Sequence, residues 1–233
     1  RKHTMKAMIL AAGRGERMRP LTDHTPKPLL NIADKPLIVW HIERLVAAGI
    51  HEIIINHAHL GQQIENTLGD GAQFGAALSY SAETPPALET AGGIAKALPF
   101  FANQAFIVIN GDIFTDYPIK QLKQRILQPT QYAHLILVNN PTHHLQGDFS
   151  LSEDMLLPVK TENAAYTFSG IGLYHPDLFK QVKENTPAKL APILYQAIAE
   201  KQITGEVYQG IWLDVGTPER LEQANQLAEK ILF

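Results

Sequence analysis

The sequence predicts an α/β fold in which a mostly parallel, mixed sheet is flanked by helices. Three observations predict it: short apolar runs alternate with helical segments, glycine or proline ends most of these segments, and 45% of the 233 residues are hydrophobic. Strand–helix–strand crossovers are right-handed and join parallel strands, so this alternation favours a sheet covered on both faces. With 18% charged residues, the chain has enough apolar material for a large core, which excludes disorder.

The first half of the chain has the clearer pattern. Residues 5–12 form a continuous apolar run that stops at glycine, which is typical of a strand buried on both faces. A loop with three prolines follows over residues 13–34, and Pro36 then begins a helix that Gly49 ends. The other segments expected in this half are strands at 51–56, 76–81 and 105–110 and helices at 60–68 and 89–98.

The second half of the chain is less regular. The segments expected there are a strand at 133–138, irregular β structure at 147–157 and 166–174, a helix at 186–201 and a strand at 205–212. A last helix begins after Thr217, because threonine is a good N-cap and Pro218 suits the first turn.

Composition and charge exclude several classes of protein. The formal net charge is −3, from 20 basic and 23 acidic residues, whereas a dedicated nucleic-acid or anionic-membrane binder has a basic excess. Cysteine is absent, which excludes disulfides, cysteine-type zinc sites and thiol nucleophiles. No apolar run approaches 18 residues and the first residues lack the apolar core of a secretory signal, so we expect a cytoplasmic protein. Monomer and homodimer both remain open.

A glycine-rich loop, Gly13-Arg14-Gly15, follows the first predicted strand. Small residues there allow backbone N–H groups to approach a phosphate chain. A dinucleotide-binding fingerprint requires a third glycine where Met18 stands, and an acidic residue where the second strand ends at Asn56. A Walker loop requires Gly-Lys-Ser/Thr, which is missing. The loop therefore indicates either an ordinary strand–helix turn or a triphosphate site supplied with cations, namely Arg17, Arg19 and Lys27.

Two aspartates follow apolar runs at positions far apart in the sequence. Asp112 lies just past the strand expected at 105–110, at the carboxyl end where ligands of open α/β sheets bind. Asp214 follows Ile211-Trp212-Leu213 and precedes Gly216. Carboxylate oxygens are the ligands that Mg²⁺ prefers, with waters and substrate phosphates completing its shell. The alternative is that the two are separate turn or capping carboxylates.

Six segments, in order, resemble the signature of the sugar-1-phosphate nucleotidyltransferases. They cover nearly the whole chain, at residues 10–22, 26–30, 89–93, 110–112, 168–172 and 212–218. Within that family the chain is most similar to the single-domain N-acetylmuramate-1-phosphate uridylyltransferases of bacterial cell-wall recycling. The resemblance implies a Rossmann-like nucleotidyltransferase fold with a sugar-binding β insertion, in one domain over residues 1–233. Residues 5–115 would form the nucleotide-binding part, and residues 116–233 the sugar-binding and C-terminal part.

The resemblance also implies the reaction and its cofactor. UDP-N-acetylmuramate and pyrophosphate would form from UTP and N-acetylmuramate 1-phosphate, by in-line attack on the α-phosphate. Asp112 and Asp214 would meet and hold Mg²⁺, and Arg17 and Lys27 would neutralise the phosphates, which makes these four the expected catalytic residues. The expected nucleotide-binding residues are Ala11, Ala12, Gly13, Gly15, Arg17, Lys27, Glu83, Glu89, Thr90 and Gly92.

Glu83 is the side chain that the resemblance assigns to the base, together with main-chain groups at Glu89 and Thr90. Its carboxylate can accept the N3–H of uracil, but guanine offers N1–H and N2–H₂, so the sequence leaves the base open. A solvated loop carboxylate is the alternative for Glu83. Two glycines at a helix start are unfavourable by propensity, so Gly92-Gly93 predicts close packing on a ligand or on the glycine-rich loop.

The expected sugar-binding residues are polar side chains and a glycine: Asn110, Asn140, Asp148, Lys160, Glu162, Ser169 and Gly170. Aspartate and asparagine side chains, and bare backbone beside glycine, suit hydroxyl recognition. Relatives often carry a Glu-Lys-Pro element before this point, where this chain has residues 159–163 without it. One hypothesis is that Lys160 meets the lactyl carboxylate of a muramate.

Two alternatives keep part of this interpretation. A mannose- or glucose-1-phosphate nucleotidyltransferase using GTP or dTTP keeps the fold and the chemistry. A non-catalytic nucleotide-sensing domain would bind a triphosphate without releasing pyrophosphate, but it has no need of both Asp112 and Asp214. The pairs His57/His59 and His143/His144 lack a third ligand nearby in sequence, so we interpret them as solvated or supporting residues rather than metal ligands.

Overall fold

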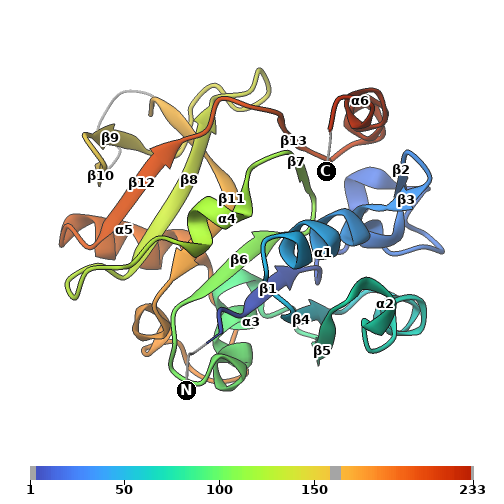
Figure 1. Cartoon of the computed structure of the whole chain (residues 1–233), viewed down its shortest axis with the longest axis horizontal. Helices are drawn as coiled ribbons and strands as arrows, with labels where there is room; N and C mark the ends of the chain where they lie inside the picture. The colour runs from blue at the N-terminus through green and yellow to red at the C-terminus, as the bar shows by residue number, and fades with distance from the viewer. Residues whose placement is uncertain (1–3, 158–163, 232–233) are drawn as a thin grey trace.

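A nine-stranded mixed sheet organises the part of the chain that the structure describes (Figure 1). The structure is a computed structural model and describes residues 4–157 and 164–231. Across the sheet the strands lie in the order β5 (Ala77–Ala82), β4 (Glu52–His57), β1 (Ala7–Leu10), β6 (Phe106–Asn110), β11 (Tyr166–Tyr174), β8 (Ala133–Asn139), β12 (Ile203–Val207), β10 (Met155–Leu157) and β9 (Ser150–Ser152).

The direction of the strands changes across the sheet. The first four, β5, β4, β1 and β6, are parallel to one another. β11 is antiparallel to both of its neighbours, β6 and β8. Beyond β8, β12 is parallel to β8, β10 is antiparallel to β12, and β9 is antiparallel to β10. Residues 166–174, expected as irregular β structure, form the nine-residue strand β11, with an irregularity between Phe168 and Ile171. The expected mixed α/β sheet is confirmed, with its parallel strands concentrated in the first half of the chain.

The register brings the carboxyl ends of the parallel strands to one edge. Leu10, the last residue of β1, lies opposite Asn56 of β4 and Asn110 of β6. β4 continues to His57, which lies opposite Ala82 at the end of β5. The loop after β1 therefore begins between the carboxyl ends of β4 and β6. Open α/β sheets bind ligands at this edge.

Helices cover both faces of the sheet. On one face, α1 (Leu37–Ala47), α2 (Gly61–Leu68) and α4 (Ile119–Lys123) pack with Ala7 and Ile9 of β1. On the other face, α3 (Glu89–Ala97) and α5 (Leu190–Ala199) pack with Met8. Successive side chains of a strand point to opposite faces, so β1 divides its apolar run between two buried clusters.

A third cluster fixes the C-terminal helix, α6 (Pro218–Ala228). Its Ala224 packs with Trp40 of α1 and Phe114 of a two-stranded ribbon, which β7 (Ile113–Thr115) and β13 (Trp212–Asp214) form. Thr217 caps α6 as predicted, because its hydroxyl accepts the Arg220 N–H at 3.3 Å.

Two elements differ from the sequence prediction. Residues 205–212, expected as one strand, are divided between β12 and β13. The Asp116 carboxylate accepts the Ile211 N–H at 2.8 Å and also accepts the Tyr208 hydroxyl. These two hydrogen bonds hold the chain between the two strands away from the main sheet. The helix expected at 186–201 begins only at Leu190. The Ala188 carbonyl before it accepts the N–H groups of two residues of α3, so this segment is engaged in a tertiary contact instead of a helical turn.

Short elements complete the fold, and the sequence analysis did not predict them. They are the hairpin of β2 (Asn31–Ile32) and β3 (Lys35–Pro36) and the 3₁₀ turns η1 (Glu16–Met18), η2 (Lys27–Leu29), η3 (Ala72–Phe74), η4 (Leu98–Phe101) and η5 (Pro176–Phe179). Among the described residues, no helix combines the length and the apolar character needed to cross a membrane.

Candidate active site

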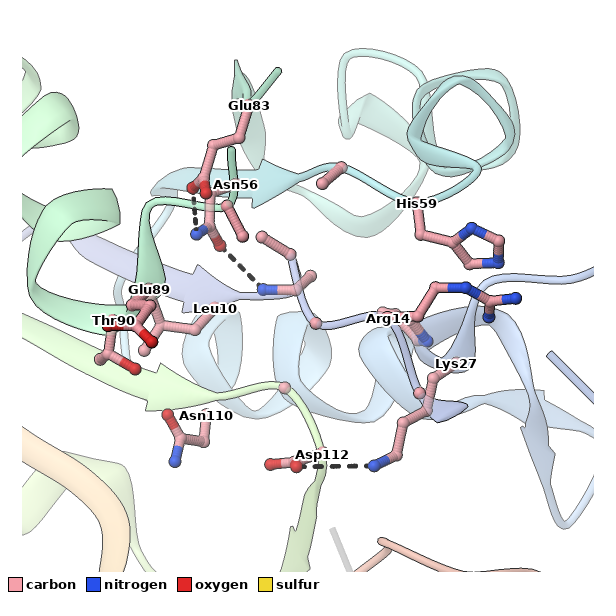
Figure 2. Close-up of a pocket in the computed structure, with 18 of the residues that line it drawn as sticks. Leu10, Arg14, Lys27, Asn56, His59, Glu83, Glu89, Thr90, Asn110 and Asp112 are labelled. Atoms are coloured by element: carbon pink, nitrogen blue, oxygen red, sulfur yellow. Dashed lines mark hydrogen bonds and ion pairs between the residues drawn. The ribbon is translucent and has the colours of Figure 1, made fainter. Parts of the chain in front are cut away.

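A cavity of about 840 Å³ lies at the carboxyl edge of the parallel strands. It is lined by the glycine-rich loop, the ends of β4 and β6, the β5–α3 connection and the start of α3. Figure 2 shows Glu83 and Asn56 on one side of this cavity and Lys27 and Asp112 on the other. Nearly all of the expected nucleotide-binding residues line it, namely Ala11, Ala12, Gly13, Gly15, Arg17, Lys27, Glu83, Glu89 and Thr90.

The glycine-rich loop has one position where glycine is required by the backbone. Gly15 has a φ of +70° and precedes the turn η1. A Cβ at this position would lie 3.1 Å from Thr22 Cγ2 and 3.3 Å from Lys27 Cβ. Gly15 therefore lets the loop fold tightly against the segment that carries Lys27. Gly13, by contrast, faces open space, with nothing within 4 Å of an added Cβ.

Ala11 lines the cavity, but its backbone N–H is already engaged. It donates to Asn56 Oδ1 at 2.8 Å. Asn56 is 3% exposed, so this bond is buried. Ala11 therefore has no free N–H to offer a nucleotide.

Glu83 is buried at the end of the cavity opposite the Lys27–Asp112 pair (Figure 2). Its carboxyl Oε2 accepts a hydrogen bond from Asn56 Nδ2 at 2.7 Å. The alternative of a solvated loop carboxylate is therefore wrong, since only 7% of Glu83 is exposed. Glu89 and Thr90 line the cavity at the start of α3, where a helix has N–H groups without intrahelical partners.

The two glycines of α3 have different neighbours. Gly92 does not line the cavity: an added Cβ there would lie 2.8 Å from the Thr186 carbonyl oxygen, and its N–H donates to Ala188. The expectation that Gly92 contacts a ligand or the glycine-rich loop is corrected accordingly, because its open face is filled by the segment before α5. An added Cβ on Gly93 would lie 2.9 Å from both Asn56 Nδ2 and Glu83 Oε2.

The β7–β13 ribbon brings Asp112 and Asp214 to the same place. Asp214 pairs with Ile113 across the ribbon, and the Asp112 carbonyl accepts the Val215 N–H at 2.7 Å. The Asp112 carboxylate lies 3.5 Å from Lys27 Nζ, and its side chain is 47% exposed. Two acidic residues that are distant in sequence therefore lie beside each other at the mouth of the glycine-rich loop.

Asp214 is held by Arg220, which the sequence analysis did not select, and by His143, which it interpreted as a solvated or supporting residue. Its Oδ1 lies 2.7 Å from Arg220 Nε, and its Oδ2 is in contact with His143 Nε2. An added Cβ on Gly216 would lie 2.9 Å from Arg17 Nη2 and 3.0 Å from Asp214 Oδ1, which places Arg17 at the same cluster. Arg220 has a sequence signal, since it lies in the first turn of a capped helix after Asp214. The sequence drew attention to His143 only through its spacing to His144, and its contact with Asp214 agrees with the supporting role.

His41 lies behind this end of the cavity, on α1. Burial, and to a lesser degree the charge of Arg44, lower the pKa of His41 to about 4, although backbone hydrogen bonds at Gly111 and Ile113 act in the opposite direction. The imidazole is therefore neutral near pH 7, and it packs beneath the backbone that carries Asp112.

The sugar candidates fall into two groups. Asn110 lines the cavity, and Gly170, with a φ of +86°, packs on it so closely that an added Cβ would lie 2.8 Å from Asn110 Nδ2. Ser169 is buried beside them: its hydroxyl accepts the Ile171 N–H at 3.1 Å, and its carbonyl accepts the Trp212 indole N–H at 2.9 Å.

The other two described candidates, Asn140 and Asp148, are engaged within the protein. Asn140 accepts the Thr167 hydroxyl at 2.8 Å and donates to the Ala164 carbonyl at 2.9 Å. Asp148 accepts the Phe168 N–H at 2.8 Å and lies 3.0 Å from His144 Nε2. These bonds attach the 140–148 loop to β11. Lys160 and Glu162 lie outside the described residues.

Comparison with known proteins agrees with this geometry. Residues 6–147 match the family described as nucleotidyl transferase. A relative from Neisseria meningitidis serogroup B, named N-acetylmuramate alpha-1-phosphate uridylyltransferase, is 52% identical over 227 residues, covering 96% of this chain and 98% of its own. The chain belongs to the nucleotidyl transferase family.

This nucleotidyltransferase has further relatives with other names. A mannose-1-phosphate guanylyltransferase catalytic subunit beta from Drosophila pseudoobscura is 31% identical, and the match covers 92% of this chain but 60% of that relative. Among solved structures, a Bacillus anthracis protein provisionally named glucose-1-phosphate thymidylyltransferase superposes with a TM-score of 0.86 at 26% identity, covering 99% of this chain and 97% of its own. The Rossmann-like nucleotidyltransferase fold is confirmed by this agreement over the whole chain.

Enzymes of this family generally use a divalent metal ion. Among its described residues, the nucleotidyltransferase has no group of three or more acidic or histidine side chains able to hold a metal unaided. Asp112 and Asp214 are two carboxylates at one place, and Mg²⁺ is commonly held by one or two carboxylates together with substrate phosphates. The donor set therefore fits a metal that binds together with a triphosphate.

Proposed function

We propose that the chain is a uridylyltransferase that forms UDP-N-acetylmuramate and pyrophosphate from UTP and N-acetylmuramate 1-phosphate. The observation that carries the proposal is the layout of one cavity, with a buried carboxylate, Glu83, at one end and the Asp112–Asp214 cluster at the other. The glycine-rich loop lies between them. The identity of the sugar follows the relative that is 52% identical over almost its full length.

In the proposed reaction, a phosphate oxygen of the sugar phosphate forms a bond to the α-phosphorus of UTP, and the bond to the leaving pyrophosphate breaks. The attacking oxygen is already an anion, so no general base is required. Arg17 and Lys27 neutralise the phosphates, and the loop orients them. Mg²⁺ bound by Asp112 and Asp214 would supply further charge neutralisation at the phosphates.

We further propose a sugar site on the 116–233 side of the same domain. Asn110, Ser169 and Gly170 form one wall beside the phosphate end, and bare backbone next to a glycine suits sugar hydroxyls. Asn140 and Asp148 would act by holding the 140–148 loop, given their bonds within the protein. The chain is proposed to act as a monomer or homodimer without a nucleic-acid or membrane partner.

Lys160 is proposed to meet the lactyl carboxylate that distinguishes N-acetylmuramate from N-acetylglucosamine. We expect Lys160→Ala to reduce the preference for N-acetylmuramate 1-phosphate over N-acetylglucosamine 1-phosphate, because a cation partner of that carboxylate is lost. The ratio of kcat/KM values for the two sugar phosphates measures it. An unchanged ratio would remove Lys160 from the site.

The proposed function is tested by a screen for pyrophosphate release. Four nucleoside triphosphates, UTP, GTP, dTTP and CTP, are each combined with N-acetylmuramate, N-acetylglucosamine, mannose and glucose 1-phosphates. The highest kcat/KM is expected for UTP with N-acetylmuramate 1-phosphate. Preference for GTP with mannose 1-phosphate would favour the activity named for the Drosophila relative. Triphosphate binding without pyrophosphate release under any combination would favour a nucleotide-sensing domain.

A further inference from the structure

We infer that Asn56 is a positioning residue that sets base selectivity, by occupying one oxygen of Glu83 and leaving the other as a single acceptor for the base. The inference deepens the proposed function and rests on it, together with the family resemblance that assigns Glu83 to the base. The inference goes beyond the proposed function because it names the residue that limits which bases Glu83 can recognise.

The orientation of the Asn56 amide is fixed by chemistry. The Ala11 backbone N–H can only donate, so the amide atom 2.8 Å from it is the acceptor Oδ1. Nδ2 consequently points to Glu83 and donates to Oε2 at 2.7 Å. Both bonds are buried, and turning the amide round would leave two buried groups unpaired. Figure 2 shows this chain of contacts from the β1 loop through Asn56 to Glu83.

Glu83 is held in place from two further directions. Its backbone N–H donates to the His57 carbonyl at 2.8 Å, which fixes the start of the β5–α3 connection. Gly93 of α3 packs against the Asn56–Glu83 contact, where an added Cβ would lie 2.9 Å from each partner. Within residues 4–157 and 164–231, the other carboxyl oxygen, Oε1, has no hydrogen-bond or ion-pair partner. Glu83 therefore offers one carboxyl oxygen without a partner at the cavity.

One acceptor suits some bases and not others. Uracil and thymine present a single ring N–H, at N3, between two carbonyl groups. Guanine presents N1–H and N2–H₂ side by side, and a carboxylate with both oxygens free accepts both of them. Cytosine presents an unprotonated N3, which a carboxylate repels. With Oε2 occupied by Asn56, the site matches the uracil or thymine edge and loses the paired contact that guanine needs.

The Glu83→Gln variant gives the sharpest test. With Asn56 in place, the glutamine carbonyl must accept from Asn56 Nδ2, so the glutamine NH₂ faces the cavity. That donor opposes the N3–H of uracil and suits the N3 of cytosine. Calorimetric titration of the full chain with UTP, CTP and GTP, without sugar phosphate, should show UTP binding weakened roughly tenfold or more, and CTP becoming the preferred ligand.

Asn56→Ala provides the second arm. Releasing Oε2 should raise the affinity for GTP relative to UTP by about tenfold. In the double variant Asn56→Ala/Glu83→Gln, the glutamine is free to rotate and present its carbonyl, so UTP binding should recover relative to Glu83→Gln alone. The matched control is Asn225→Ala, because Asn225 also accepts a backbone N–H, from Ala33 at 2.7 Å, and donates to the Leu221 carbonyl, but on α6. Its ratio of UTP to GTP affinity should equal that of the wild type.

Two results would overturn the inference. One is a Glu83→Gln variant that still prefers UTP while Asn56 is present. The other is a folded Asn56→Ala variant with the wild-type ratio of UTP to GTP affinity. If Asn56→Ala does not fold, Glu83→Gln decides the question by itself. A wild-type chain that binds UTP but releases no pyrophosphate with N-acetylmuramate 1-phosphate would instead contradict the proposed function, since these titrations contain no sugar.

Discussion

Asp112 and Asp214 have adjacent backbones but different surroundings. The Asp112 side chain is 47% exposed and has Lys27 as an ion-pair partner. The Asp214 side chain is 24% exposed, pairs with Arg220 and contacts His143. Asp112 is therefore the better residue for separating catalysis from stability, because the loss of an exposed ion pair costs little folding free energy.

Asp112→Asn should lower turnover severely without unfolding the chain. Removing one charge that stabilises a transition state typically raises the barrier by roughly 3 kcal/mol, or about a hundredfold in rate. Pyrophosphate release and thermal unfolding measure the two effects. The matched control is Asp154→Asn, since Asp154 is also an exposed carboxylate near a cation, Arg125. Near-normal turnover of Asp112→Asn would remove Asp112 from the proposed metal site.

His41 makes folding stability depend on pH. Burial lowers its pKa from 6.5 to about 4, so the unfolded chain binds a proton more readily than the folded one. Its contribution is fully present above pH 6.5 and is lost as the pH falls towards 4. At pH 5 the loss is roughly 2 kcal/mol. Urea unfolding measures the free energy of unfolding at pH 8 and at pH 5. The decrease between the two pH values should be larger for the wild type than for His41→Gln. Equal losses in both proteins would contradict it.

At the scale of elements, the sequence contains enough to predict the parallel core. The apolar runs of β1, β4 and β6 are continuous and end at glycine or polar residues, and the caps of α1 and α6 are visible as Pro36, Gly49 and Thr217. These are local signals, and the structure confirms them. Asp112 could be selected because it follows one of these strands, and Lys27 because it is a cation close to the glycine-rich loop, whereas Glu83 is assigned only by the family resemblance.

The rest of the site depends on contacts that have no local signal. β7 and β13 are three-residue strands whose pairing joins segments about a hundred residues apart, so neither is visible as a strand by itself. The late start of α5 depends on the contact of Ala188 with α3. His143 reaches Asp214 from an irregular loop. In the sequence, Asn56 is informative only because it stands where a dinucleotide-binding site has an acidic residue. Its hydrogen bonds to Ala11 and Glu83 join segments distant in sequence and have no local signal.

Gly92 and Gly13 should respond differently to alanine. Gly92→Ala places a Cβ 2.8 Å from the Thr186 carbonyl, so overpacking should destabilise the fold by roughly 1–3 kcal/mol. Gly13→Ala meets nothing within 4 Å and should leave the unfolding free energy unchanged. Because Gly13 lines the cavity, the same change should raise KM for the triphosphate. Denaturant unfolding and steady-state kinetics on both variants check this. A stable Gly92→Ala would show that the segment before α5 can move aside.

At the scale of the whole molecule, one sheet carries both the nucleotide end and the proposed sugar end. β6 contributes Asn110 to the cavity, and β11 beside it carries Ser169 and Gly170, of which Gly170 packs on Asn110. Helices on both faces bury this sheet, so the two ends are held by a common core. At the cluster of the two central aspartates, Lys27 pairs with Asp112 and Arg220 pairs with Asp214, so each carboxylate has a cationic side chain as a neighbour.

Removal of divalent metal should therefore affect activity and not stability. We expect EDTA to abolish pyrophosphate release and to leave the melting temperature of the substrate-free protein unchanged, because the carboxylates keep their cationic partners. Differential scanning calorimetry with and without EDTA measures the second part. A lower melting temperature in EDTA would reveal a structural metal, and full activity in EDTA would contradict the proposed catalytic role of the metal.

The ribbon of β7 and β13 also has a consequence for biosynthesis. A growing polypeptide completes the glycine-rich loop, Glu83 and Asp112 long before residue 214 leaves the ribosome. Until then β7 lacks its pairing partner, and half of the proposed metal site does not exist. Translation interrupted between β12 and β13 would thus yield a product that has all of its parallel strands and the glycine-rich loop but lacks Asp214, and we expect it to be inactive.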